Sequence, residues 1–253
     1  MKFRIEPKDI IESAANKTSL PIIRKRKLKM FSPALLGLGD VSQDAEQIEA
    51  ICCIVDLAGF TKFCSQVDPY LIIPELLHSF LEWIYAEILK ESIKDKFPKG
   101  ATLYTDLPMM SKFLGDGVLF LWDVKKWPHY KISNLIAVMN NIRIHYKKEF
   151  YPEVLKQVPC PPPLLRCGIA RGHVYSVGDG NDFVGPCINI ASRLQKYGKF
   201  TFAVSQRGIP KLNENYVLIS GAVRGVSDGE NIYVLRWEYN KLEKEDKARY
   251  KVL

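Results

Sequence analysis

Residues 51–61 read ICCIVDLAGFT, and this stretch decides the fold. Its first five residues form an unbroken apolar run, which is typical of a β-strand buried on both faces. The run ends at Asp56, and the following residues up to Thr61 read as a turn. The stretch therefore predicts a central strand with a carboxylate, that of Asp56, at its end.

Downstream of this strand, helical and strand patterns alternate. Pro69 suits the first turn of a helix, and apolar residues then recur at helical spacing as far as Ile88. Residues 94–108 hold two prolines and one glycine and read as a loop. Residues 112–122 read as a β-hairpin, because Asp116-Gly117 between two apolar runs is a strong turn signal.

The second half of the chain continues the alternation. The pattern predicts helices over 135–146 and 186–198, a strand over 165–174, and short strands over 201–205, 217–219 and 231–236. This order of elements predicts an α+β fold, with a mixed, largely antiparallel sheet and helices packed on one face.

Length and charge bound the domain organisation. The 253 residues suffice for one substantial domain. Residues 1–30 carry nine Lys/Arg and three Asp/Glu, so they hold most of the net charge of +8. We expect a basic extension over 1–45, one folded domain over 46–240 and a charged tail over 241–253. No aromatic residues are interleaved with the basic cluster 24–29, so we expect a solvated arm or subunit contact rather than a nucleic-acid site.

Two further features indicate the compartment. No run of eighteen apolar residues exists, so we expect no membrane-spanning segment. The six cysteines form no CxxC pair, and reduced thiols suit a cytoplasmic protein.

Two groups of polar residues are candidates for chemistry. Asp56 ends a buried strand and Asp116 lies at a hairpin turn, so their carboxylates converge if the two elements are neighbours. Carboxylate oxygens are the ligands that Mg²⁺ or Mn²⁺ takes when it bridges substrate phosphates. Asn189 and Arg193 are four residues apart near the start of a helix, where they suit stabilisation of charge on a phosphoryl group. Taken alone, either aspartate could be an ordinary turn former or cap, and Asn189 with Arg193 could be an ordinary solvated polar face.

Taken together and in order, these motifs resemble the catalytic domain of class III adenylyl and guanylyl cyclases. The resemblance rests on DLAGFT at 56–61, KFLGDG at 112–117 and DFVGPCINIASR at 182–193, and it covers roughly residues 48–236. It implies the ferredoxin-like cyclase fold, two divalent cations (Mn²⁺ or Mg²⁺) and a nucleoside triphosphate substrate. The roles it implies are metal binding for Asp56, Leu57 and Asp116, substrate binding for Phe60, Thr61, Lys112, Asp182 and Arg224, and catalysis for Asn189 and Arg193.

The resemblance also implies assembly and mechanism. Cyclases of this class work as head-to-tail dimers with composite sites, which implies a homodimer here. Their two metal ions assist attack of the ribose 3′-oxygen on the α-phosphorus. This sequence departs from the pattern in two places. The interval from Asp56 to Asp116 is longer than usual, and Val223-Arg224-Gly225 stands where the class has a lysine-containing Val-Lys-Gly-Lys-Gly stretch.

The base specificity follows only in part from the residues. Lys112 and Asp182 offer one donor and one acceptor, which disfavours guanine but does not separate adenine from the pyrimidines. With no sensor domain, transmembrane anchor or coiled-coil linker in view, the chain resembles the stand-alone cyclases of bacterial Pycsar antiphage systems. That resemblance implies conversion of UTP to cyclic UMP for a separate effector. Cyclic AMP and cyclic CMP synthesis are the alternatives, and a non-catalytic module that binds nucleotides or nucleic acid is the alternative from another class.

Overall fold

The computed structural model describes residues 6, 8, 10–11, 22–66, 68–98, 100–223, 225–226 and 229–253. The chain divides into two compact units. The first contains residues 1–46 and 175–184, and the second contains residues 47–174 and 185–253. In the described ranges, no helix combines the length and the apolar content that crossing a bilayer requires.

The first unit joins the N-terminal extension to a β-hairpin. Its elements are β1 (Ile10–Ile11), β2 (Ile22–Ile23), α1 (Lys25–Met30), a 3-10 turn (Pro33–Leu36), the end of β8 (Leu164–Val177) and β9 (Asp182–Val184). The Asp179 N–H donates to the Leu38 carbonyl at 3.0 Å, and the Ser176 N–H donates to the Glu46 carbonyl at 3.0 Å. The predicted basic extension is therefore tied to residues 176–179 by backbone hydrogen bonds.

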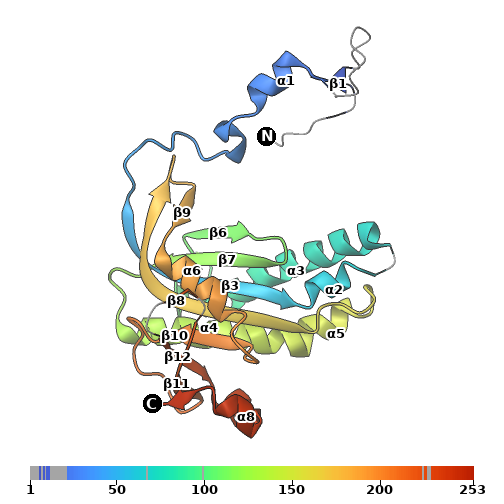
Figure 1. Cartoon of the computed structure of the whole chain (residues 1–253). Helices are drawn as coiled ribbons and strands as arrows, with labels where there is room; N and C mark the ends of the chain where they lie inside the picture. Colours follow the sequence, from blue (N-terminus) through green and yellow to red (C-terminus); the bar gives the residue numbers. More distant parts are fainter. Residues whose placement is uncertain are drawn as a thin grey trace. The chain divides into compact units, whose positions relative to one another are not determined.

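The second unit holds the main sheet and its helices (Figure 1). From the N-terminal side, its first elements are β3 (Gln47–Ala58), α2 (Phe60–Phe63), α3 (Pro69–Ser92), β4 (Ile93–Phe97), β5 (Gly100–Leu103), β6 (Met110–Phe113), β7 (Gly117–Asp123), α4 (His129–His145), a π-helical turn (Tyr146–Phe150), α5 (Tyr151–Val154) and most of β8. The remaining elements are α6 (Pro186–Leu194), β10 (Phe202–Ser205), β11 (Tyr216–Gly221), β12 (Glu230–Leu235), α7 (Arg236–Lys241), α8 (Lys244–Lys247) and β13 (Lys251–Val252).

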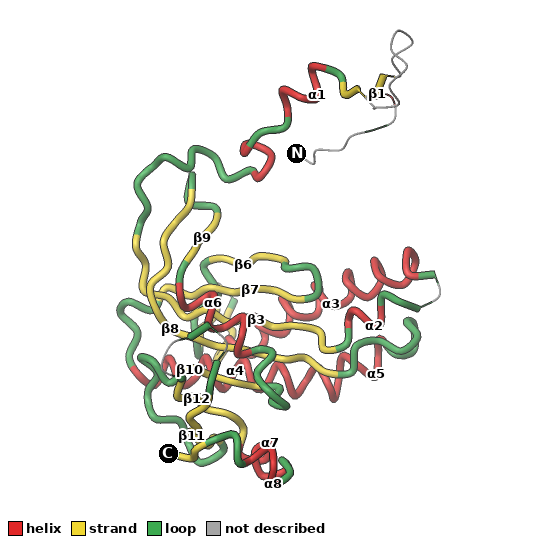
Figure 2. Tube along the Cα trace, viewed as in Figure 1, coloured by secondary structure: helices red, strands yellow, loops and turns green. Residues whose placement is uncertain are grey.

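The main sheet is mixed and mostly antiparallel. Its strand order is β13-β11-β12-β10-β8-β3-β7-β6, and the central strands run side by side in Figure 2. β8 and β10 are parallel, whereas β3 with β7, β6 with β7, β10 with β12 and β11 with its two neighbours are antiparallel. The α+β fold class predicted from the sequence is confirmed. The end of the chain also joins this sheet, because β13 pairs with β11.

The largest hydrophobic cluster lies between the sheet and the helices α3 and α4. Alternate β3 residues Ile51, Cys53 and Val55 face this cluster. Phe80 and Ile84 of α3, four residues apart on one helix face, are fully buried in it. Burial of each such large apolar side chain contributes about 1.5–3 kcal/mol. This packing fixes β3 as the centre of the fold.

Helix α6 covers the opposite face of the sheet, which differs from the prediction that the helices pack on one face. It contacts β3 and β10, and in Figure 1 it lies in front of the sheet while α3 and α4 lie behind it. Gly168 of β8 makes this approach possible, because a Cβ there would lie 2.2 Å from the Ala191 carbonyl oxygen of α6. A side chain at this position would push the helix off the sheet.

The segment 94–108 is also more ordered than predicted. The expected loop contains part of an antiparallel β-hairpin, in which β4 pairs with β5. All four residues of β5 are exposed, so no apolar alternation marks the strand in the sequence. The hairpin lengthens the interval between Asp56 and Asp116 without entering the main sheet.

Candidate active site

Two neighbouring strand ends bring Asp56 and Asp116 together. Asp56 lies near the end of β3 and is paired in register with Gly117, the first residue of β7. Asp116 precedes that strand, and its carbonyl oxygen accepts the Leu57 N–H at 2.9 Å. Asp56 is only 2% exposed, whereas Asp116 is half-buried. Burial and the nearby charge of Asp56 raise the pKa of Asp116, which is the response expected of two carboxyl groups held side by side.

Glycine at position 117 permits this close approach. A Cβ on Gly117 would lie 2.1 Å from the Val55 carbonyl oxygen, so any side chain would separate the two strands at the carboxylates. Gly115 has a φ of +100°, a conformation that L side chains rarely adopt. The turn that presents Asp116 therefore depends on both glycines. Its central residues are Gly115 and Asp116, one residue earlier than the predicted Asp116-Gly117, because the Leu114 N–H donates to the Gly117 carbonyl at 2.9 Å.

Two cations of the same chain lie beside the aspartates, and sequence reasoning missed both. Arg166 of β8 donates to Asp56 Oδ2 from Nη2 at 2.5 Å and from Nε at 3.2 Å. Lys196 Nζ lies 3.7 Å from Asp56 Oδ1, and its charge opposes the rise in the pKa of Asp116. The signal for Arg166 was a charged residue between the apolar Leu165 and Cys167 near the start of the predicted strand.

After Asp56, strand β3 ends at Ala58, and Gly59 leads directly into the short helix α2. Leu57 is buried, Phe60 is half-buried and Thr61 is exposed. The Phe60 ring packs against the core, with its centroid 5.8 Å from that of Phe63. The Thr61 carbonyl accepts the Ser65 hydroxyl at 3.1 Å, which leaves the Thr61 hydroxyl outside that contact. All three residues lie within five positions of Asp56, and the metal role expected of Leu57 and the substrate roles expected of Phe60 and Thr61 stay predictions.

Helix α6 presents Asn189 and Arg193 to solvent. Both residues are exposed, while Ile190, Ala191 and Leu194 of the same helix are buried against the sheet. The Arg193 guanidinium lies against Gly225, where an added Cβ would come within 2.7 Å of Nη1. The helix therefore has the polar face that the sequence predicted. The backbone at Gly225 lies close to the Arg193 guanidinium on that face.

A cavity of about 650 Å³ adjoins this face of α6. It is lined by Ser192, Arg193, Lys196, Tyr197, Gly198, Ala222, Val223, Arg249 and Tyr250. Three of these residues are basic, so the cavity suits an anionic ligand. Lys196 belongs both to this lining and to the surroundings of Asp56, so a phosphate group bound here would lie next to the aspartate pair.

The expected base-recognising residues lie in different units. Lys112 is exposed on β6 in the second unit. Asp182 is half-buried on β9 in the first unit, and its Oδ1 accepts the Phe183 N–H at 2.9 Å. Their joint role in base recognition stays a prediction. Arg224, expected to bind the triphosphate, lies outside the described residues.

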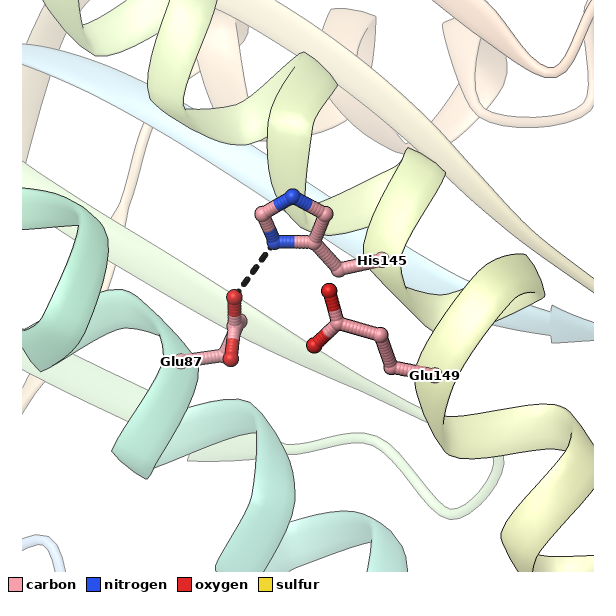
Figure 3. Close-up of side chains that lie close together, drawn as sticks. All are labelled: Glu87, His145 and Glu149. Carbon is pink, nitrogen blue, oxygen red and sulfur yellow. Dashed lines mark hydrogen bonds and ion pairs between the residues drawn. The ribbon is translucent and has the colours of Figure 1, made fainter.

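A second carboxylate cluster lies between α3 and the π-helical turn after α4 (Figure 3). Glu87 Oε1 is 2.5 Å from His145 Nδ1, and Glu149 is close to both residues. Lys90 Nζ pairs with Glu87 at 3.0 Å and with Glu149 at 3.6 Å, so a protein cation already meets the charge of this cluster. Both carboxylate groups thus have protein cations beside them, and the metal role expected of Asp56 and Asp116 stays a prediction.

Comparison with known proteins identifies the fold. No protein-family model and no curated protein matches the chain. Among solved structures, the adenylyl cyclase CyaB from P. aeruginosa aligns with a TM-score of 0.59 at 18% identity, over 76% of this chain and 96% of that one. The guanylyl cyclase Cya2 aligns with a TM-score of 0.58 at 17% identity, over 76% and 94% of the two chains.

A third structure extends the same likeness. The catalytic core of a rhodopsin-guanylyl cyclase with converted specificity, solved in complex with ATPalphaS, aligns with a TM-score of 0.53 at 18% identity, over 76% of this chain and 98% of that one. In each case nearly the whole of the matched chain is covered, so the likeness concerns a complete domain. The chain therefore has the fold of the class III adenylyl and guanylyl cyclase catalytic domains.

Proposed function

We propose that this chain is a nucleotide cyclase, which converts a nucleoside triphosphate into the 3′,5′-cyclic monophosphate and pyrophosphate. One observation carries the proposal: in a chain with the cyclase fold, Asp56 and Asp116 meet at adjacent strand ends, beside Arg166 and Lys196. Paired carboxylates next to cations form a site for a metal-bound polyphosphate.

The aspartate pair fits the divalent cations that the proposal requires. Asp56 and Asp116 supply only oxygen donors, which Mg²⁺ and Mn²⁺ prefer. Burial and, after it, the charge of Asp56 raise the pKa of Asp116, and a bound cation would offset the repulsion between the two carboxylates. When bound, the two ions would supply Lewis acidity at the 3′-hydroxyl and at the phosphates.

The chain's own residues would hold the substrate around this pair. Arg166 fixes the orientation of the Asp56 carboxylate. Arg193 and Lys196, which line the cavity beside α6, would neutralise phosphate oxygens, and Asn189 would orient the ribose. The ribose 3′-oxygen then bonds to the α-phosphorus and its proton passes to solvent. The bond from the α-phosphorus to the bridging oxygen breaks, and pyrophosphate leaves.

The activity is tested by incubating the purified chain with each of the four nucleoside triphosphates and Mn²⁺, with products identified by mass spectrometry. Wild type should form a cyclic nucleotide, and Asp56→Ala and Asp116→Ala should each form none. Asp95→Ala, at an exposed β4 position, is the matched control and should retain activity. Turnover by both active-site variants at saturating Mn²⁺ would refute the metal assignment, and binding without turnover in wild type would favour a non-catalytic module.

The proposal includes a homodimer with shared sites, as in the class that the motifs resemble. Asp56→Ala and Arg193→Ala should each be inactive, yet a mixture should regain part of the activity, because one site in each heterodimer then keeps both groups. Lys196 already lies beside Asp56 within one chain, so a site formed by a single chain is the competing arrangement. Absence of recovery after subunit exchange would favour that arrangement.

For the substrate we propose UTP, with cyclic UMP acting in the cytoplasm on a separate effector, as in stand-alone antiphage cyclases. ATP and CTP are the alternatives. Lys112 would donate to a uracil carbonyl and Asp182 would accept from its N3–H, whereas the O6 and N1–H of guanine match this donor and acceptor less well. GTP turnover should therefore be slowest, by roughly tenfold to a hundredfold. A competition assay with equal ATP and UTP decides the preference, and mostly cyclic AMP would overturn it.

A further inference from the structure

A second cavity, of about 580 Å³, lies beside α7 in the second unit. It is lined by Arg143, Ile144, Lys147, Lys148, Leu164, Lys199, Thr201, Trp237, Glu238, Lys241 and Leu242. It shares no lining residue with the cavity beside α6. Its size falls in the range of small-molecule sites, which is about 300–1,000 Å³.

Positive charge in this lining exceeds what nearby carboxylates balance. Five of the lining residues are basic and one, Glu238, is acidic. Lys199 pairs with Asp246 at 2.6 Å. Across the described ranges, no carboxylate forms an ion pair with Arg143, Lys147, Lys148 or Lys241. Cations that converge without partners repel one another, and an anion between them would relieve that repulsion.

The one acid of the lining is already engaged. Glu238 is 6% exposed, and its Oε2 accepts the Thr201 N–H at 3.1 Å while its Oε1 accepts the Thr201 hydroxyl. Burial raises the pKa of Glu238. Both of its oxygens are therefore held by Thr201, and this single carboxylate stands against five basic residues of the lining.

Arg143 is held at the cavity by hydrogen bonds to neutral groups, and the nearby Glu238 carboxylate offsets part of its charge. It is 9% exposed, and its guanidinium donates to Asn140 Oδ1 at 3.0 and 3.2 Å and to the Thr201 hydroxyl at 3.3 Å. The Trp237 ring holds two cations, Arg143 at 5.8 Å and Lys241 at 4.8 Å from its centroid. Cation–π contacts attract a cation without cancelling its charge. The cavity therefore contains preorganised positive charge.

We propose that this cavity binds a small multivalent anion of the phosphate class. A guanidinium suits the paired oxygens of a phosphate, and flexible lysines act as point charges around it. The π-helical turn after α4 supplies two consecutive lysines, 147 and 148, which are both exposed at the rim. This proposal does not depend on the cyclase activity, because its residues lie outside the candidate active site.

The probe for this site is inorganic tripolyphosphate, titrated into the full chain while tryptophan fluorescence is recorded at constant ionic strength. Binding should change the emission of Trp237, and the change should be absent in Trp237→Phe. The double variant Lys147→Gln, Lys148→Gln should bind about tenfold more weakly, because two charges at the rim are lost. The matched control is Lys125→Gln, Lys126→Gln, which removes two consecutive exposed lysines elsewhere.

The cavity beside α6 also suits phosphates, so the titration is repeated in an Arg193→Ala background. The Trp237 signal should keep its affinity there, while calorimetry loses any contribution from the other cavity. Equal affinities of the two lysine double variants would overturn the proposal, as would a wild-type chain without a saturable Trp237 signal. Loss of that signal in Arg193→Ala would also overturn it, because the anion would then occupy the candidate active site.

Discussion

Replacing Asp116 by Asn should stabilise the metal-free protein while it removes activity. The Asp116 carboxyl is half-buried beside the almost fully buried Asp56, and both burial and that neighbouring charge raise its pKa. The ionised form is therefore disfavoured in the folded state. Asn has nearly the same size and no charge, so the substitution removes the repulsion and leaves the turn intact.

The expected gain is small, because Asp116 is partly exposed to water and Lys196 already offsets part of the repulsion. Partly exposed charge pairs contribute about 0.2–1 kcal/mol. For a chain of 253 residues, 1 kcal/mol corresponds to roughly 2–4 °C in Tm. Asp116→Asn should therefore raise Tm by about 1–3 °C in EDTA.

In Mn²⁺, wild type should have a higher Tm than Asp116→Asn, the reverse of the order in EDTA. A ligand at 100 times its Kd stabilises the folded state by about 2.7 kcal/mol, and wild type keeps both carboxylates that would bind the ion. The variant should gain much less, so the two Tm values should cross as Mn²⁺ is added. Differential scanning calorimetry in EDTA and in Mn²⁺ measures both effects, with Asp95→Asn as the exposed control on β4. A variant less stable than wild type in EDTA would show that Asp116 makes net favourable contacts, and the reasoning would fail.

Three further predictions concern the packing and charges around the site. Gly117→Ala should cost about 1–3 kcal/mol in urea unfolding, because its Cβ would lie 2.1 Å from the Val55 carbonyl oxygen; an unchanged midpoint would contradict the close approach. Arg166→Gln should cost about 1–3 kcal/mol by leaving buried Asp56 without its closest partner, and adding Asp56→Asn should recover part of that loss. Burial raises the pKa of Glu238, so the folded state holds that proton more tightly and stability should fall as pH rises through the folded pKa. In Glu238→Gln the free energy of unfolding should not show this fall. If the free energies of unfolding of wild type and variant changed with pH in parallel, the prediction would be wrong.

The features that the sequence predicted well are local ones. The apolar run ending at Asp56 marks β3 because a strand buried on both faces leaves no polar position to fill. The glycines around Asp116 mark the hairpin because Gly115 takes a positive φ that few residues accept, although the predicted turn was placed one residue late. The polar pair on α6 needs only helical spacing. Each of these predictions depends only on residues that are close together in the sequence.

The features that the sequence did not predict depend on distant or exposed residues. The Arg166–Asp56 contact joins residues 110 apart, and only the pairing of the sheet brings them together. The position of α6 depends on Gly168, because a side chain there would collide with the helix. The sequence does not reveal this requirement, since α6 is distant from Gly168 along the chain. The β4–β5 hairpin is exposed, so no apolar period distinguishes its strands from a loop.

The contact between Glu87 and His145 fixes how α3 and α4 align. Apolar side chains alone would tolerate several registers of two packed helices, because one methyl group replaces another with little loss. A carboxylate that is 6% exposed tolerates only the register that supplies its donors. A slide of one helical turn, about 5.4 Å, would take His145 away from Glu87 and leave that carboxylate with Lys90 of its own helix. This buried polar contact therefore opposes sliding of α3 against α4. A displacement of either helix would be passed on to β3, which packs against both.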